Sequence, residues 1–351
     1  MSSRLGVAVL GATGMVGQIY VQMLSRHPWF EIRAVTGNST VGKTLGEAYR
    51  GKGHVPEKYA DLEVLPSDPA KIDADLVFSC LPTKAAREVE PKFAAAGFPV
   101  VSDSSAHRYL PDVPLIIPEV NPEHLDLIDV QRRRRGWDGY IVTTPNCTTV
   151  GFALPLKPLA DDFGLKHVNV VTMQAVSGAG YNGVPSMAIL GNIIPYIEGE
   201  EAKVSEEPRK ILGKLVDSEV KPLDITVDAT CMRAPTIVGH LEAVQVELSR
   251  DVPLEEVVAS LAGFTGLPQK LELPTAPRRP IRVFSEEERP QPRLDSDAGE
   301  VPGMVISVGR VRKGKRPGTA MFVTLSHNLI RGAAGSAILT AELLYALRRL
   351  D

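Results

Sequence analysis

The chain has 351 residues, a length that fits two domains or one large α/β unit. Hydrophobic residues make up 44% of it and charged residues 23%, so the chain can bury a large core and is not intrinsically disordered. Its net charge of -3 favours neither a nucleic-acid partner nor a membrane surface, and no apolar stretch reaches the roughly 18 residues that a membrane helix needs.

The three cysteines, Cys80, Cys147 and Cys231, are odd in number and lack the spacing of metal ligands. We therefore expect no disulfide framework and no metal site. The chain opens directly on an apolar run of strand length, without a charged and then apolar leader. The expected location is a reducing compartment, the cytoplasm.

Apolar runs of strand length alternate with helical patterns up to residue 105. We expect strands at 5–10, 31–35, 74–82 and 99–105, and helices at 19–27 and 84–96. This alternation predicts a parallel, doubly wound sheet.

The pattern changes near residue 150. Long, partly alternating runs follow at 168–178, 225–235, 239–249, 304–314 and 319–327. They predict an α+β domain with a largely antiparallel sheet. The Pro-, Arg- and Glu-rich stretch at 272–303 is expected to be a long loop, and a last helix is expected at 331–350. The fold class is therefore α/β, with an α+β second domain.

A glycine-rich loop, GATGMVG, follows the first strand and opens the first helix. Gly11, Gly14 and Gly17 leave the backbone amides of this turn free to face a pyrophosphate. The spacing is G-x-x-G-x-x-G rather than G-x-G-x-x-G, so a merely tight strand–helix turn is the alternative. The loop favours a dinucleotide cofactor.

The end of the second strand bears on the kind of cofactor. A dinucleotide without a 2′-phosphate usually meets an Asp or Glu there. The residues here are TGNSTVGK, without an acid, and Ser39, Thr40 and Lys43 suit a 2′-phosphate. NADP is therefore preferred over NAD, the alternative being that this is only a polar loop.

Cys147 lies in a polar run, TTPNCTTVG, just before a probable helix start. The partial positive charge of a helix N-terminus favours the thiolate, and its amides can bind an oxyanion. Together with a cofactor loop, this predicts hydride transfer through a thioester. Cys80 and Cys231 lie in apolar strands and are expected to be packing residues, although Cys80 ends a parallel strand and can lie near the cofactor.

The candidate acid/base is His240. It follows Arg233 by seven residues, an odd offset that would put the two on opposite faces of one strand. Ala234-Pro235 and Gly239 interrupt the run, so Arg233 and His240 can flank one pocket from either side of a bend. A structural histidine is an equally good interpretation from the residues alone.

Several motifs, in this order, resemble the aspartate-semialdehyde dehydrogenases over almost the whole chain. They are GATGMVG, FSCLP, SDSSAHR, TTPNCTT, QAVSGAG, the pattern E-x-K-x-x-x-E-x-x-K-I at 201–211, RAPTIVGH and HNLIRGAAGSA. The stretches IPEVNPEHLDL, RRGWDGYIVTTPNC and RPQPRLD look most like the archaeal and fungal branch.

The resemblance implies the domain organisation. Residues 1–146 would form the dinucleotide-binding domain and 147–330 the catalytic and dimerisation domain, with the last helix, 331–351, returning to the first. It also implies a homodimer or homotetramer.

The resemblance also implies a role for individual residues. Cys147 would be the nucleophile, His240 the acid/base and Gln174 the residue that orients the intermediate. Arg233 would bind the substrate α-carboxylate, Glu201 its ammonium group, and Arg108 and Lys203 the phosphate, with Asn146 in the same pocket. The implied cofactor contacts are Gly11, Thr13, Gly14, Met15, Val16, Ser39, Thr40, Lys43, Ser79, Leu81, Pro82, Ser177, Gly178 and Asn328.

The reaction implied is the NADPH-dependent conversion of L-aspartyl 4-phosphate to L-aspartate 4-semialdehyde and phosphate, which leads to lysine, threonine, methionine and isoleucine. Three alternatives stay open: a malonyl- or succinyl-CoA reductase, a more distant N-acetylglutamyl-phosphate reductase, and a non-catalytic dinucleotide-binding regulator. The chain departs from the family pattern in two places. It lacks a cation before Gly42-Lys43 and an acidic residue before Gly239-His240.

Overall fold

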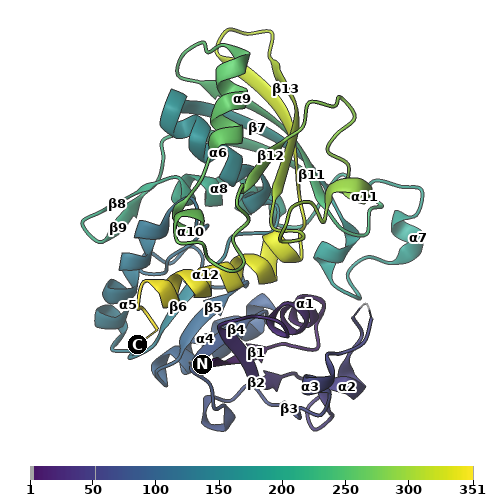
Figure 1. The fold of residues 1–351 in the computed structure, drawn as a ribbon, viewed down its shortest axis with the longest axis vertical. Helices are drawn as coiled ribbons and strands as arrows, with labels where there is room; N and C mark the ends of the chain where they lie inside the picture. Colours follow the sequence, from purple (N-terminus) through teal and green to yellow (C-terminus); the bar gives the residue numbers. More distant parts are fainter. Residues whose placement is uncertain (1–3, 52, 351) are drawn as a thin grey trace.

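The computed structural model describes residues 4–51 and 53–350 and contains two six-stranded sheets (Figure 1). Each sheet has its own apolar core, and a helix near the C-terminus passes between them.

The first sheet has the strand order β3-β2-β1-β4-β5-β6, and all its neighbouring strands are parallel. Its strands are β1 (Leu5–Leu10), β2 (Phe30–Thr36), β3 (Val64–Leu65), β4 (Leu76–Ser79), β5 (Pro99–Ser102) and β6 (Tyr140–Thr143). Its helices are α1 (Met15–Leu24), α2 (Leu45–Ala48), α3 (Glu57–Ala60), α4 (Thr83–Ala95) and α5 (Leu127–Arg135). The doubly wound parallel sheet is thus confirmed.

The second sheet has the order β10-β7-β11-β14-β13-β12. Its strands are β7 (Leu165–Gln174), β10 (Thr226–Arg233), β11 (His240–Leu248), β12 (Ile281–Val283), β13 (Ile306–Lys313) and β14 (Thr319–Ser326). The central pairs from β7 to β13 are antiparallel, whereas β10 and β12 pair in parallel at the two edges. The largely antiparallel sheet is therefore confirmed, and α6 (Thr149–Phe163) and α9 (Leu254–Gly263) pack against it in one core.

Three predicted elements differ in detail. The strand expected at 168–178 ends at Gln174 and continues as a 3-10 turn, Val176–Ala179, whose first N–H groups bond to the carbonyls of Thr236 and Ile237. The stretch at 272–303 is not wholly loop: it contains β12 and the short α11 (Pro292–Asp295). The last helix begins with a π-helical segment, Ile330–Ala334, before α12 (Gly335–Ala346).

Further short elements and one longer helix follow β7 in the chain. They are α7 (Ser186–Ile189), α8 (Glu200–Ile211), α10 (Leu267–Lys270) and a hairpin of β8 (Lys214–Val216) and β9 (Glu219–Lys221). No helix in the described ranges is both long enough and apolar enough to cross a membrane.

Helix α12 belongs to the core of the first sheet although it comes last in the chain. Ala337, Ile338 and Leu343 are fully buried in the same cluster as Val7 and Tyr20. Figure 1 shows α12 crossing the molecule between the two sheets. The chain therefore crosses back to its first sheet after completing the second one.

Candidate active site

The glycine loop turns sharply between β1 and α1. Gly11 has a φ of +83°, a conformation that side chains other than glycine rarely adopt. A Cβ atom at Gly17 would lie 2.3 Å from the carbonyl oxygen of Gly11, so the helix can pack this closely only without a side chain. Gly14 precedes α1 without a side-chain cap, which leaves the first-turn N–H groups available to an anion. These features fit the pyrophosphate of a dinucleotide.

A cavity of about 950 Å³ extends from this loop to Cys147. Most of the predicted cofactor contacts line it: Gly11, Thr13, Gly14, Met15, Val16, Ser39, Leu81, Pro82, Ser177, Gly178 and Asn328. Asn328 lies in the cavity wall beside Ser177. Its Nδ2 donates to the Ser177 hydroxyl at 2.9 Å, and its Oδ1 accepts the Gly239 N–H at 2.9 Å.

Three predicted cofactor residues lie elsewhere. Ser79 is fully buried, and its hydroxyl donates to the Glu90 carboxylate at 2.6 Å behind the cavity wall. Thr40 is not part of the cavity lining, and its hydroxyl lies 3.2 Å from that of Thr13, which is. Lys43 is exposed and is not part of the wall. These three predictions came from sequence proximity, which does not determine where a side chain points.

The cavity wall at the end of β2 consists of Gly37, Asn38, Ser39 and Val41. Among the described residues of this wall segment there is neither an acid nor a cation. A 2′-phosphate can therefore enter without meeting a negative charge, and Ser39 is the hydroxyl available to it.

Cys147 stands between β6 and α6, at the start of the helix as predicted. The side-chain oxygen of Asn146 accepts the N–H groups of Thr148 at 2.9 Å and Thr149 at 3.4 Å. These first amides of α6 are therefore already hydrogen-bonded and are not the oxyanion donors that the helix start suggested.

Cys147 is half-buried, and charged groups of both signs lie around its thiol. Burial and the Glu200 carboxylate raise its pKa to about 12, whereas Arg108, Arg233 and Lys203 lower it. The prediction that the helix N-terminus would by itself favour the thiolate is wrong, because desolvation outweighs a helix end whose amides are capped by Asn146. Cys147 is a thiol at neutral pH.

Gly332 packs directly against Cys147. A Cβ atom at this position would lie 2.8 Å from the Cβ of Cys147, closer than such atoms approach in proteins. The π-helical segment that carries Gly332 is held by Arg331, which makes a fully buried bidentate ion pair with Glu119 at 3.0 and 2.7 Å. The segment thus forms a fixed wall behind Cys147.

His240 faces the sulfur of Cys147. Its Nε2 lies 3.3 Å from Cys147 Sγ, and its Nδ1 accepts the backbone N–H of Ala175 at 3.0 Å. The pKa of His240 falls to about 3, first because the ring is buried and then because Arg233 and His327 lie near it. The imidazole is therefore neutral, and since Nδ1 accepts a hydrogen bond, the proton resides on Nε2.

Arg233 ends β10 and His240 begins β11, with the bend of residues 234–239 between them. Both side chains approach Gly178. A Cβ atom added there would lie 3.1 Å from Arg233 Nη1 and 3.3 Å from His240 Nε2. The structure therefore brings the two residues together across the bend. Arg233 Nη1 also donates to the carbonyl of Ala175 at 2.7 Å.

Gln174 is buried at the end of β7, next to Arg233 in the strand register. Its amide donates to the Thr172 hydroxyl at 3.3 Å, and it is not part of the cavity wall.

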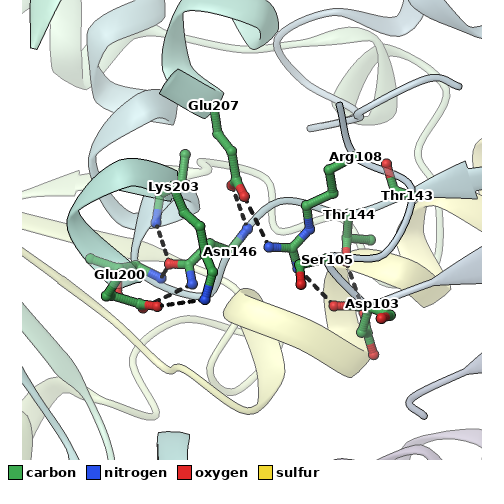
Figure 2. A network of polar contacts seen from close by, with 12 residues as sticks. Asp103, Ser105, Arg108, Thr143, Thr144, Asn146, Glu200, Lys203 and Glu207 are labelled. Atoms are coloured by element: carbon green, nitrogen blue, oxygen red, sulfur yellow. Dashed lines mark hydrogen bonds and ion pairs between the residues drawn. The ribbon is translucent and has the colours of Figure 1, made fainter. Parts of the chain in front are cut away.

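Basic and acidic side chains converge on Asn146 (Figure 2). Arg108 Nη1 donates to Glu207 at 2.9 Å, and its Nη2 donates to the carbonyl of Asp103 at 2.7 Å. Lys203 donates to Glu200 at 3.1 Å. Arg108, Lys203 and Asn146 all line the cavity beside Cys147, which places two cations near the sulfur.

The predicted ammonium-binding residue, Glu201, lies outside this group. Its carboxylate accepts the backbone N–H of Cys231 at 3.2 Å, on the side of α8 that faces β10. Glu200, one residue earlier, is 6% exposed and accepts from the Asn146 amide at 2.8 Å. Glu200 and not Glu201 therefore joins the group around Asn146, because neighbouring helical residues point about 100° apart.

Three comparisons with known proteins are consistent with this geometry. A profile described as "Semialdehyde dehydrogenase, NAD binding domain" matches residues 6–128, and one described as "Semialdehyde dehydrogenase, dimerisation domain" matches residues 156–331. The chain is 54% identical to an aspartate-semialdehyde dehydrogenase of Archaeoglobus fulgidus, over 97% of this chain and 98% of the relative.

The chain belongs to the semialdehyde dehydrogenase family. It is also 46% identical to a malonyl CoA reductase (NADP) of Metallosphaera sedula, over 100% of this chain and 99% of that protein. The crystal structure of aspartate semialdehyde dehydrogenase with NADP from Candida albicans superimposes with a TM-score of 0.90 at 39% identity, over 99% and 100% of the two chains.

Sequence reasoning missed several residues of this semialdehyde dehydrogenase site. Glu207 is fully buried between Arg108 and the Asn146 backbone, and the E-x-K-x-x-x-E pattern was the signal that could have identified it. Gly332 and the Ala175 amide had no such signal, because only the fold brings them to Cys147 and His240.

The other cysteines agree with their predicted packing roles in this family member. Cys231 is fully buried, and Cys80 lies at the cavity wall with its thiol donating to the carbonyl of Leu10 at 3.1 Å. Within residues 4–51 and 53–350, no group of three or more His, Cys, Asp and Glu is arranged to hold a metal ion.

Proposed function

We propose that this protein catalyses the NADPH-dependent conversion of L-aspartyl 4-phosphate to L-aspartate 4-semialdehyde and phosphate, through a thioester on Cys147. One observation carries the proposal. Cys147 Sγ lies 3.3 Å from His240 Nε2, at the point where the dinucleotide cavity meets the basic pocket of Arg108 and Lys203. The aspartate-semialdehyde dehydrogenases among the relatives support it.

Acylation joins the Cys147 sulfur to the acyl carbon of the substrate and breaks the bond from that carbon to the phosphate oxygen. Arg108 and Lys203 bind the leaving phosphate, where a planar guanidinium suits two phosphate oxygens. Because Cys147 is a thiol at neutral pH, its proton leaves as the bond forms and passes to the departing phosphate, which leaves as hydrogen phosphate. The covalent step replaces one difficult displacement by two easier ones.

His240 acts as a hydrogen-bond donor to the reacting groups. Its Nε2–H points at the sulfur because its Nδ1 is held by the Ala175 amide. It can therefore stabilise the oxyanion of the tetrahedral intermediate, and then the thiolate that leaves when the aldehyde is released. This geometry does not let Nε2 accept the thiol proton.

NADPH, when bound in the cavity, supplies the hydride that reduces the thioester carbon. The glycine loop would hold its pyrophosphate and Ser39 its 2′-phosphate, while Ser177 and Asn328 form the wall near Cys147. Gly178 allows the close approach of this wall to Arg233 and His240.

The amino-acid end of the substrate pairs with two charged residues. Arg233 binds the α-carboxylate and Glu200 the ammonium group, which takes over the role first given to Glu201. Glu200 is held on one side by Asn146 and on the other by Lys203, so its two oxygens are already oriented.

A second candidate is the reduction of malonyl-CoA, favoured by the 46% identical malonyl CoA reductase. Cys147, His240 and Arg233 would serve both substrates, since malonate also has a free carboxylate. Glu200 discriminates between them, because malonyl-CoA has no ammonium group to pair with this buried carboxylate.

The test is NADPH oxidation by the pure protein with L-aspartyl 4-phosphate and, separately, with malonyl-CoA. We expect turnover of the acyl phosphate that disappears in Cys147→Ala. Turnover of malonyl-CoA alone would overturn the choice of substrate and keep the chemistry. Activity that survives in Cys147→Ala would overturn the thioester.

We further propose a homodimer or homotetramer. The segment 181–196 exposes large apolar side chains on the second domain, namely Tyr181, Met187, Leu190, Ile193 and Tyr196. Such a group is unfavourable in water unless a partner covers it. Light scattering coupled to size-exclusion chromatography tests the assembly, and a monomer at micromolar concentration would contradict it.

Three free thiols also agree with a reducing, cytoplasmic location.

A further inference from the structure

Helix α8 presents a polar stripe to the loops of the first domain. Glu200, Lys203, Glu207 and Lys210 follow each other at intervals of three, four and three residues, which places them on one face of the helix. The first two belong to the substrate pocket described above. The proposed function gives no role to Glu207 and Lys210.

Glu207 joins two parts of the active site. It is fully buried, and its two oxygens have different partners: Oε1 accepts from Arg108 Nη1 at 2.9 Å, and Oε2 accepts the backbone N–H of Asn146 at 2.6 Å. Asn146 precedes the nucleophile, and Arg108 is the proposed phosphate ligand. One carboxylate therefore fixes the distance between the phosphate site and Cys147.

Lys210 holds the chain segment that carries Arg108. Its ammonium group donates to three backbone carbonyls, those of Arg108 at 2.7 Å, Leu110 at 3.0 Å and Val113 at 2.9 Å. An ammonium group has three N–H donors, so all of them are used. Residues 108–113 are thus bound around one side chain from the other domain.

Arg108 depends on these contacts for its orientation. Its side chain is 5% exposed, with Nη1 on Glu207 and Nη2 on the carbonyl of Asp103, while its Nε is buried without a partner. An arginine binds phosphate best when its planar fork is already oriented, because less freedom is lost on binding.

We propose that Glu207 and Lys210 are positioning residues, which act through Arg108 to hold the phosphate-binding guanidinium in register with Cys147. This inference rests on the proposed function, since it assumes that Arg108 binds phosphate. Neither residue is itself proposed to touch the substrate.

The test measures phosphate as a substrate in the oxidative direction, with aspartate semialdehyde and NADP. Glu207→Gln and Lys210→Met are compared with the matched exposed controls Glu206→Gln and Lys214→Met. We expect both stripe variants to raise the KM for phosphate about 10-fold or more while the KM for NADP changes less than about twofold. The controls should behave as the wild type.

Glu207→Gln is informative because it preserves shape. The glutamine side chain has one oxygen, which accepts, and one NH₂ group, which donates. Arg108 and the Asn146 N–H are both donors, so one of them must face the NH₂ group. Because Asn146 adjoins Cys147, this variant should lower kcat as well, whereas Lys210→Met should act mainly on the KM for phosphate.

A double-mutant cycle separates positioning from general destabilisation. On an Arg108→Lys background, Lys210→Met should add less than about twofold to the KM for phosphate, because the guanidinium that it orients is gone. Full additivity, or KM values for phosphate and NADP that rise in parallel, would overturn the proposal.

A failure of the proposed function can be distinguished from a failure of the positioning role. If the wild type does not turn over aspartate semialdehyde, the same variants are compared by the phosphate concentration that half-protects Cys147 from iodoacetamide. A wild-type value in Glu207→Gln and Lys210→Met in that assay would overturn the positioning role independently of the substrate.

Discussion

The Nδ1 atom of His240 accepts the backbone N–H of Ala175 at 3.0 Å. This one hydrogen bond determines the tautomer of the ring and directs its only proton at Cys147. It also opposes protonation of the ring, because an imidazolium would place its Nδ1–H against the N–H of Ala175. The consequence can be measured as a dependence of stability on pH.

We predict that His240 makes the protein less stable in acid. Its pKa is about 3 in the folded chain, below the ordinary value near 6.5, so the unfolded chain binds the extra proton first. Stability is complete above pH 6.5 and declines as the pH falls from there towards 3. Between pH 7 and pH 5 the wild type should lose about 2 kcal/mol more unfolding free energy than His240→Asn.

Urea unfolding at the two pH values checks this prediction. The other buried histidines are present in both proteins, so their contributions cancel in the difference. Equal losses in the two proteins would show that the ring is already protonated at pH 5 or that Nδ1 does not accept the Ala175 bond.

We predict that Glu200 and Glu201 differ in function although they are neighbours. Glu200→Gln should raise the KM for aspartate semialdehyde by about 10-fold or more, because a buried carboxylate that pairs with the ammonium group is lost. Glu201→Gln keeps an oxygen for the Cys231 N–H and should leave this KM within about twofold. Steady-state kinetics of the two variants decide between them, and the reverse ranking would restore the original assignment to Glu201.

Gly332→Ala should impair the nucleophile without unfolding the protein. The added Cβ would lie 2.8 Å from the Cβ of Cys147, so the cysteine must move by several tenths of an ångström. We expect kcat to fall about 100-fold, because small misplacement of a reacting group has large effects. The measurement is kcat together with circular dichroism. A fully active Gly332→Ala would mean that the π-helical segment yields easily.

Ser39→Asp should shift the cofactor preference from NADP towards NAD. An acid at the end of β2 binds the ribose hydroxyls of NAD and repels a 2′-phosphate. The kcat/KM ratio of NADP to NAD should fall about 100-fold or more, while Lys43→Ala, outside the cavity, should change it little. A large effect of Lys43→Ala would show that the lysine reaches the phosphate.

Much of the fold was predictable because its signals are local. The apolar run of β1, the glycine loop and the helical pattern of α1 are contiguous in sequence, and each is found, although α1 is Met15–Leu24 rather than the expected 19–27. The 3-10 turn after Gln174 and the strand β12 were not predicted, because both depend on pairing with distant chain segments.

The site was predictable where chemistry restricts the residue type. Cys147 was predictable as a cysteine among polar residues before a helix. His240 and Arg233 were predictable as a histidine and an arginine on either side of a bend that contains Pro235 and Gly239. The sign of the pKa change at Cys147 was not predictable, because burial is a property of the folded chain. The different contacts of Glu200 and Glu201 were unpredictable for a similar reason, since only the helix phase distinguishes the two residues.

The position of α12 has a consequence for synthesis on the ribosome. The first sheet is complete in the nascent chain at Thr143, yet its core also contains Ala337, Ile338 and Leu343. At about 5–20 residues per second, the interval before α12 appears is on the order of 10 to 40 s. During that time the apolar face that α12 will cover is open to chaperones and to other nascent chains. A truncation or a bulky fusion at the C-terminus is therefore expected to destabilise the core of the first sheet, although the strands of that sheet are synthesised first.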